Sequence, residues 1–572
     1  MIKQKQFYQY LFHCLDKPRF FIGLFLSFIS AGMGLLIPQF IGKMMDMSFL
    51  TFILSNPLML IGMLLFFLSV YTLQAISSYL LGMSGNQAMK KMQESLHRKI
   101  LSLSITDVER YQAGDLSNRL TNDMSVVLKL ISVTFPQVIM NLFIIVGTAY
   151  FLVSINFYLT LVSLVLILCL LFVTLPINAK LEMCFLDHQN LLGKLAGDLG
   201  HKFSKFRLIK SMNGEKQEIK IMSKVFSELF KNFRKILAIS SFQSALLNSV
   251  IMFFILIIIL IAGWQVQKGI MTIVTLTTFI IYVMQLLEPT SELIQSLDDF
   301  AEVKGVGTRV VELFNLASED NNFSYTEVND FSISFDAVSF SYSEQEKRVI
   351  DNLSFHISSG QHVAIIGPSG SGKTTLFSLL MKFYQYDAGE ILIGGKRLRD
   401  LSSENVRDLI SYTSQDNTLF HGTLRENLTY GKNSKVSDER MYFVLKELDL
   451  LSLMNQLPKG LESHISDSGQ GLSEGQKQRF NIARSLMLPS DIYLFDEITA
   501  SLDVETERII TKAVNSLTEG KTRLTIAHRL STIREADIVF VFDDNGRIVD
   551  KGKHEELQLR NTSYQSYLQE LN

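Results

Sequence analysis

The chain has 572 residues, of which 47% are hydrophobic, and its formal net charge is −2. This length exceeds one domain, and the apolar residues concentrate between Phe20 and Leu287, whereas the second half has the composition of a soluble protein. A net charge near zero gives no sign of the basic surface that binds nucleic acid, so we expect no nucleic-acid partner. No disulfide framework is expected either, because we place none of the three cysteines outside the cell: Cys14, Cys169 and Cys184.

Six apolar stretches in the first half predict an all-α membrane domain with six spans. The first, Phe20 to Gly42, would cover ~34 Å as a helix, enough for a ~30 Å hydrocarbon core. It is too long for a signal peptide, and no small-residue cleavage pattern follows it. Aromatic residues before it, from Phe7 to Phe12, suggest an interfacial helix. The other five stretches run from Pro57 to Gly82, Thr134 to Val153, Phe157 to Pro176, Ala245 to Gln265 and Thr272 to Leu287.

The orientation follows from the positions of the cations. Lysines and arginines are dense after the second span, from Lys90 to Arg119, and after the fourth, from Lys202 to Lys235. The opposite loops offer little beyond Lys43 and Lys268. The positive-inside rule therefore places both termini and the two long loops in the cytoplasm.

The two long loops carry helical patterns with few turn signals, so we expect helices that continue beyond the bilayer. Each loop contains a break, Tyr111-Gln-Ala-Gly114 in the first and Met212-Asn-Gly214 in the second. These tips are where a membrane domain would press on a cytoplasmic motor. An ordinary solvated turn is the alternative interpretation.

The pattern changes to strands from Phe331, with period-two alternation in Ile333 and Phe335, then in Val338, Phe340 and Tyr342. The continuously apolar run Val363-Ala-Ile-Ile366 predicts a buried strand that leads into a glycine-rich loop and then a helix. This context is typical of an α/β phosphate-binding loop. The candidate nucleotide-binding residues of the loop are Gly367, Pro368, Ser369, Gly370, Ser371, Gly372, Lys373, Thr374 and Thr375.

The chemistry of the loop is specific. Its glycines let backbone N–H groups and the helix N-terminus face the phosphates. Lys373 would bind the β and γ phosphates, and the hydroxyl of Thr374 would ligate Mg²⁺. Asp496, at the end of an apolar strand, is the expected metal-orienting carboxylate. Glu497 beside it would accept a proton from the attacking water, with a structural salt bridge as the alternative.

Together with Leu472-Ser-Glu-Gly-Gln476, these motifs resemble a half-transporter of the ATP-binding cassette superfamily, in its exporter branch, similar to bacterial multidrug and lipid exporters. The resemblance implies a six-helix membrane domain at residues 1–315, a linker at 316–330 and an ATP-binding cassette at 331–572. It implies that Tyr342 stacks on adenine, that Gln415 contacts Mg²⁺, and that His528 holds the γ phosphate. A plain strand aromatic is the alternative for Tyr342.

The segment Leu472–Gln476, which we call the signature segment, also has implications for assembly. In the family it caps the ATP bound to the partner cassette, so Ser473, Gly475 and Gln476 would bind nucleotide across a dimer, and Asp503 is counted with them. Three departures from the family pattern are visible: Glu474 for a glycine, the order Ala500-Ser501 before Asp503, and Asp467 for a glutamate. None removes a catalytic group. A homodimer is favoured, and a heterodimer with another half-transporter stays possible.

The substrate is less well defined by the sequence. The resemblance implies a multi-pass protein of a bacterial cell membrane that exports lipophilic or amphipathic compounds by alternating access. A dedicated lipid or peptide exporter and a non-pumping partner subunit are the alternatives, and the short segment before the first span disfavours a peptidase-coupled exporter. Polar residues in the spans are either substrate contacts or interhelical hydrogen bonds: Gln74, Gln137, Asn141, Asn248 and Gln285. Glu288 either attracts cationic drugs or is solvated.

Overall fold

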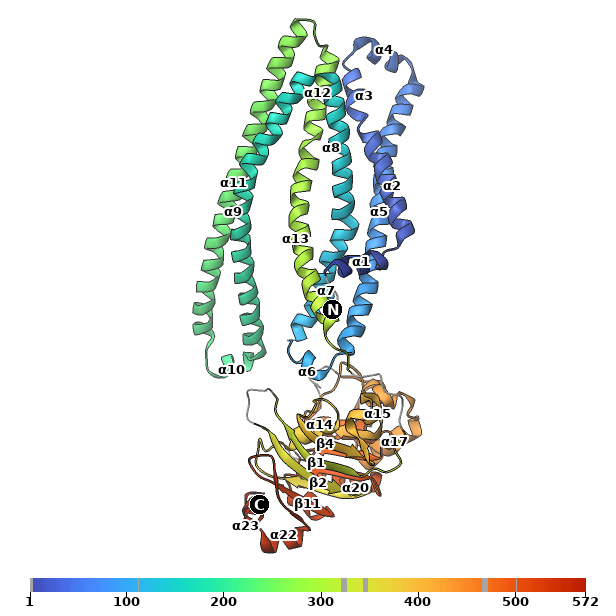
Figure 1. Ribbon diagram of the computed structural model, residues 1–572, viewed down its shortest axis with the longest axis vertical. Helices are drawn as coiled ribbons and strands as arrows, with labels where there is room; N and C mark the ends of the chain where they lie inside the picture. Colours follow the sequence, from blue (N-terminus) through green and yellow to red (C-terminus); the bar gives the residue numbers. More distant parts are fainter. Residues whose placement is uncertain are drawn as a thin grey trace. The chain divides into compact units, whose positions relative to one another are not determined.

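A computed structural model of the protein describes residues 4–111, 113–319, 327–342, 348–465, 472–499 and 502–571. The chain divides into two compact units, one of residues 1–97 and 114–315 and the other of residues 98–113 and 316–572. The first unit is helical, and the second contains the strands (Figure 1).

The helical unit is built from long helices. The three longest are α5 (Pro57–Leu101), α9 (Phe157–Ser204) and α11 (Glu215–Gln267), with 45, 48 and 53 residues. At ~1.5 Å per residue each is far longer than a ~30 Å membrane core, which confirms helices that continue beyond the bilayer. The remaining elements are α1 (Gln4–Cys14), α2 (Lys17–Gly34), α3 (Ile37–Lys43), α4 (Met47–Ser55), α7 (Ala113–Lys129), a π-helical turn (Leu130–Thr134), α8 (Phe135–Ile155), α10 (Phe206–Ser211), α12 (Ile273–Gln285) and α13 (Leu287–Asn315).

Among the described residues, five helical segments are long and apolar enough to cross a membrane. They include five of the six expected stretches. The sixth, Phe157 to Pro176, lies within α9, where some side chains are outside the described residues.

Two expected spans are interrupted next to prolines. The first divides into α2 and α3 after Gly34, four residues before Pro38, and the last divides into α12 and α13 after Gln285, four residues before Pro289. Proline has no N–H to donate to the carbonyl four residues earlier, and its ring clashes with that carbonyl. The interruptions therefore follow from the local sequence.

The expected interfacial helix α1 packs one face against α13. Phe7 and Leu11 are buried, and Tyr10 lies 5.9 Å from Phe314 between ring centroids. Tyr8 and Phe12 are exposed on the other face. The helix is therefore amphipathic, as the sequence predicts.

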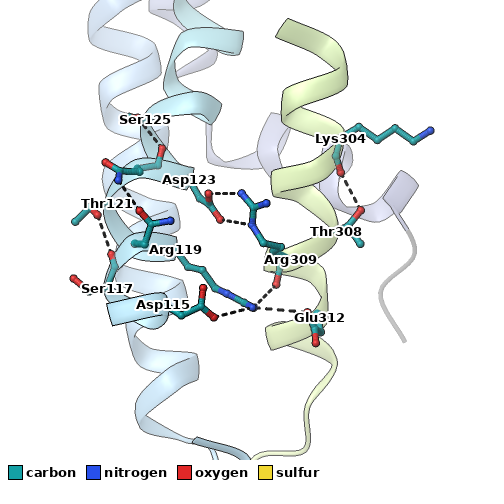
Figure 2. Close-up of polar contacts among 12 residues, drawn as sticks. Asp115, Ser117, Arg119, Thr121, Asp123, Ser125, Lys304, Thr308, Arg309 and Glu312 are labelled. Carbon is teal, nitrogen blue, oxygen red and sulfur yellow. Dashed lines mark hydrogen bonds and ion pairs between the residues drawn. The ribbon is translucent and has the colours of Figure 1, made fainter. Parts of the chain in front are cut away.

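Ion pairs join α7 to α13 (Figure 2). Arg309 donates from Nε and Nη2 to the two oxygens of Asp123, at 3.0 and 2.6 Å, and Asp123 is 3% exposed. Arg119 lies 3.1 Å from Asp115 on its own helix and donates to the carbonyl oxygen of Arg309. Its guanidinium is also 3.8 Å from Glu312. A bidentate arginine–carboxylate pair fixes the rotation of both helices.

The second unit has two main sheets. One is antiparallel with the order β2-β1-β4-β5, formed by β1 (Ile333–Phe340), β2 (Ile350–Ile357), β4 (Ala388–Ile393) and β5 (Lys396–Arg397). The other has the order β12-β11-β3-β10-β9-β6 and is parallel except for β12. Its strands are β3 (His362–Ile366), β6 (Ile410–Thr413), β9 (Ile492–Asp496), β10 (Thr522–Ile526), β11 (Ile538–Phe542) and β12 (Ile548–Gly552). A shared hydrophobic core contains residues of both sheets and of α14 (Lys373–Leu380).

The period-two alternation of apolar side chains in β1 shifts by one residue between Phe335 and Val338, where the strand contains a bulge. Ala337 has a φ of 50°, and the register with both β2 and β4 shifts at this point. Gly389 on β4 passes so close that a Cβ there would lie 2.4 Å from the carbonyl oxygen of Ala337. The extra residue turns the apolar side chains on either side of it to the same face.

Both loop tips form short helices, α6 (Ile105–Val108) and α10. Segment 98–113, which carries α6, contacts the chain after α13: Lys99 Nζ donates to the carbonyl oxygen of Leu316, and Glu319 N donates to that of Ser102. Tyr384 donates its hydroxyl to Glu109 at 2.7 Å. The first tip therefore contacts the aromatic cluster beside Tyr342.

Candidate functional site

The glycine-rich loop joins β3 to α14, as the sequence predicts. Gly372, with a φ of 86°, occupies the N-cap position of α14, which begins at Lys373. The Nζ of Lys373 donates to the carbonyl oxygens of Gly367 and Pro368, at 2.8 and 2.7 Å. Burial lowers the pKa of Lys373. The cation therefore lies inside the curve of the loop, held by the carbonyl oxygens of the loop itself.

Two carboxylates lie at the end of β9, Asp496 as its last residue and Glu497 directly after it. Asp496 is fully buried, and Thr374 donates its hydroxyl to Asp496 at 3.4 Å. Tyr412, at the end of β6, also points its hydroxyl at this carboxylate, at 3.5 Å. Burial raises the pKa of Asp496 to about 6, and repulsion from Glu497 adds to the shift. A cation placed beside Thr374 would favour the charged form.

Glu497 contacts two of the other candidate residues, Gln415 and His528. Its backbone has a φ of 52°, which is rare for a residue with a side chain. Gln415 donates from Nε2 to Glu497 Oε2 at 3.0 Å, and the Nε2 atom of His528 lies 2.8 Å from Glu497 Oε1. Gln478, on α19 (Glu474–Leu486), donates to the backbone carbonyl of Glu497 at 3.4 Å. The structure thus brings Lys373, Thr374, Gln415, Asp496, Glu497 and His528 into one region.

Tyr342 is next to the same loop. Its hydroxyl lies 3.0 Å from the hydroxyl of Thr375, and its ring packs edge to face on Tyr384. The side chain is 47% exposed.

The signature residues make a capping box in this chain. Ser473 accepts from the backbone N–H of Gln476, and the Gln476 side chain accepts from that of Ser473. Glu474 pairs with Lys477 at 2.7 Å. Asp503 caps α20 (Val504–Leu517) by accepting from Thr506. Asp467, Ala500 and Ser501 lie outside the described residues.

Sequence reasoning did not single out Tyr412, Gln478 or Tyr384. Each comes from a different element and meets the site only through folding. The position of Tyr412 in the short strand just before Gln415 was the available signal for this residue, whereas no local pattern marks the other two.

Comparison with known proteins identifies the family. The model for the ABC transporter transmembrane region matches residues 20–290, and the ABC transporter model matches residues 350–500. A multidrug resistance ABC transporter ATP-binding and permease protein of Lactococcus lactis subsp. cremoris is 31% identical over 558 residues, which are 97% of this chain and 94% of the relative. The chain belongs to the ABC transporter family.

Other similar proteins agree. An ATP-dependent lipid A-core flippase of Cupriavidus pinatubonensis is 31% identical, with 86% of this chain and 84% of the flippase covered. A solved bacterial Atm1-family ABC exporter with ATP bound has a TM-score of 0.82 at 22% identity, covering 97% of this chain and 98% of the other. The transporter is therefore a multi-pass membrane protein with the exporter fold and a nucleotide-binding, ATP-hydrolysing domain. Its half-transporter architecture implies a dimer.

Proposed function

We propose that this transporter exports lipophilic or amphipathic compounds from a bacterial cell, coupling alternating access to ATP hydrolysis. Its membrane domain would be residues 1–315, its linker 316–330 and its cassette 331–572, with both termini in the cytoplasm. The supporting observation is the 31% identity to a multidrug transporter along 97% of the chain. Cations concentrated in the two long loops support the orientation.

We assign the nucleotide chemistry to residues of this site. Lys373 Nζ would exchange its hydrogen bonds to the carbonyl oxygens of Gly367 and Pro368 for hydrogen bonds to the phosphates. The backbone N–H groups of the loop would also donate to the phosphates. Tyr342 would stack on the base. Glu497 would orient the attacking water and take its proton, and His528 would donate to the γ phosphate.

Mg²⁺ fits the oxygen atoms at this site. Thr374 Oγ1 and the side-chain oxygen of Gln415 would hold it, with Asp496 orienting the hydroxyl of Thr374. Oxygen donors combined with substrate phosphates are the ligands that Mg²⁺ prefers. The ion would neutralise the charge that develops on the phosphates.

The site is completed by a second subunit. Ser473, Gly475 and Gln476 would cap the ATP held by the partner's phosphate loop, and Asp503 would lie at the same interface. A homodimer is favoured because this chain retains every catalytic group, including Glu497.

The membrane unit offers apolar surface and a few amides to a substrate. Asn141 donates to Glu292 at 2.8 Å, which supports an interhelical role for this amide. In contrast, three other polar residues of the spans are exposed in the single chain, and so is Glu288: Gln74, Gln137 and Asn248. Burial of apolar surface contributes a favourable binding free energy of roughly 25 cal/mol per Å², before the entropic costs of association are subtracted. Because this contribution depends on area and not on chemical detail, it discriminates poorly among lipophilic compounds. Broad specificity would follow.

Transport into inside-out vesicles tests this proposal. Vesicles that contain the wild-type chain should accumulate several unrelated amphipathic dyes when ATP is added, and vesicles with Glu497→Gln should not. Accumulation of lipids alone would favour the second candidate, a dedicated lipid exporter, which the similarity to a lipid A-core flippase supports. ATP-driven uptake into right-side-out vesicles loaded with ATP would contradict export.

A further inference from the structure

The imidazole of His528 has a second polar neighbour, on the C-terminal helix α23 (Thr562–Leu571). The hydroxyl of Tyr567 lies 3.3 Å from Nδ1 of His528 and 3.4 Å from the carbonyl oxygen of Ala527. On the other side of the ring, Nε2 lies 2.8 Å from Glu497 Oε1. A carboxylate and a phenol therefore face the two ring nitrogens.

These neighbours select one tautomer of the neutral ring. Nε2 lies 2.8 Å from the carboxylate without forming a hydrogen bond of regular geometry. At this distance a lone pair on Nε2 would repel the ionised carboxylate, which only accepts, so the proton is favoured on Nε2. Nδ1 is then an acceptor, and the hydroxyl of Tyr567 has its single proton available either for Nδ1 or for the carbonyl oxygen of Ala527. In general, the hydrogen bond made by one ring nitrogen fixes the role of the other.

We propose that Tyr567 is a positioning residue for ATP hydrolysis, which holds His528 with its proton on Nε2. The same N–H that faces Glu497 in this structure then donates to a terminal phosphate oxygen of ATP. With the proton on Nδ1 instead, a lone pair would face the phosphate. The inference rests on the proposed contact between His528 and the γ phosphate.

The hydroxyl is held by a well-anchored helix. Asn561 accepts from the backbone N–H of Tyr564 at the start of α23. Tyr564 is fully buried, and its hydroxyl lies 2.7 Å from Nδ1 of His554. The ring of Tyr567 packs against the core that contains Tyr564, Leu568 and Ala527. A rigid support of this kind is what an orienting hydrogen bond needs.

The test compares two tyrosines of the same helix. Tyr567→Phe keeps the ring and removes only the hydroxyl that faces His528. Tyr564→Phe removes the equivalent hydrogen bond to His554, which lies outside the catalytic region. The full-length transporter in lipid nanodiscs is assayed for kcat, for KM of ATP and for melting temperature, alongside His528→Ala.

We expect Tyr567→Phe to lower kcat by about three- to tenfold, the effect of one neutral hydrogen bond. Its KM and melting temperature should match the wild type, and Tyr564→Phe should keep the wild-type kcat. Equal losses of kcat and melting temperature in both variants would overturn the proposal, because packing of α23 would then account for them.

Two further outcomes separate this inference from the proposed function. If His528→Ala abolishes turnover while Tyr567→Phe hydrolyses ATP at the wild-type rate, the role of Tyr567 is wrong and that of His528 stands. If His528→Ala itself hydrolyses ATP normally, the proposed role of His528 is wrong, and the positioning role of Tyr567 is overturned with it.

Discussion

Glu497, the proposed general base, has an unusual backbone conformation and well-defined contacts. Its left-handed backbone, with a φ of 52°, has a cost of order 1–3 kcal/mol and persists only where the surroundings impose it. Here Gln415 and His528 contact the two carboxylate oxygens, and Gln478 binds the backbone carbonyl. The side chain is thus fixed before nucleotide binds.

Glu497→Gln should leave ATP binding intact and lower the rate of hydrolysis. The amide keeps the shape and the contact with Gln415 but cannot take a proton from water. Loss of a positioned general base costs ~10²–10⁴ in rate. Steady-state ATPase assays and nucleotide binding on the purified variant check this, and near-normal hydrolysis would contradict the assignment.

A second residue-scale prediction concerns acid stability. Burial lowers the pKa of His362 to about 3, and the neighbouring Arg523 adds to the shift by donating to Nδ1 at 2.6 Å. The unfolded chain binds this proton near pH 6.5, so the stability from keeping His362 neutral is complete above pH 6.5 and is lost as pH falls toward 3.

His362→Gln should therefore flatten the acid dependence of cassette unfolding. Between pH 7 and pH 5.5 we expect about 1 kcal/mol less destabilisation than in the wild type. Calorimetric melting at both pH values measures this. His356→Gln is the matched control, because that histidine is exposed and pairs with Ser334. An unchanged pH dependence in the His362 variant would contradict the prediction.

At the scale of elements, paired side chains fix how helices pack. The bond between Tyr384 and Glu109 ties the tip helix α6 to the aromatic cluster of the cassette. Burial and the hydrogen bond to Glu109 both raise the pKa of the Tyr384 hydroxyl, which therefore stays protonated as a donor.

Tyr384→Phe should weaken transmission while it preserves hydrolysis. The ring still packs on Tyr342, but the link to α6 is lost. We expect basal ATPase within about twofold of the wild type and a transport rate lower by about two- to tenfold, in line with one hydrogen bond of ~0.5–1.5 kcal/mol. Tyr386→Phe, which removes a hydroxyl that donates to Glu390 at 3.3 Å, is the control. A proportional loss of ATPase and transport would argue against a transmission role.

The ion pairs between α7 and α13 yield a stability prediction (Figure 2). Arg309→Met leaves the buried carboxylate of Asp123 unpaired and should destabilise the membrane unit by about 1–3 kcal/mol. Adding Asp123→Asn should restore part of this loss, because the charge is removed. Thermal unfolding in nanodiscs measures both, and strictly additive losses would exclude coupling between the two residues.

For the whole molecule, the proposed sharing of active sites between two subunits can be tested directly. Ser473 and Gln476 bond to each other in this chain, and under the proposed arrangement their segment acts on the nucleotide of a partner subunit. A dimer of Lys373→Ala and Ser473→Ala chains would then contain one site with both defects and one site with none.

Hybrid dimers of these two variants should therefore recover hydrolysis. Co-expression with two affinity tags and sequential purification isolates the hybrid, and its nucleotide occlusion and ATPase activity are compared with each parent. We expect activity above both parents and below the wild type. Hybrids as inactive as their parents in both assays would contradict sites shared in this way.

The sequence by itself determined the architecture and most of the candidate site. Long apolar runs specify membrane helices because lipid leaves backbone groups no other partners, and the strand, glycine loop and helix around Lys373 specify a phosphate site locally. A proline alone did not determine a helix break, because Pro38 and Pro289 interrupt their helices, whereas Pro176 lies inside the continuous helix α9.

Only the tertiary structure decided which distant side chains meet. The contacts of Tyr567 with His528, Tyr384 with Glu109 and Arg309 with Asp123 join positions 39, 275 and 186 residues apart. No periodicity or motif records such pairings, because they depend on the order of strands in the sheet and on how helices pack. The bulge at Ala337 shows the same limit. The sequence contains the shift in the alternation of apolar residues, but only the pairing of β1 with β2 and β4 shows that one continuous strand accommodates this shift.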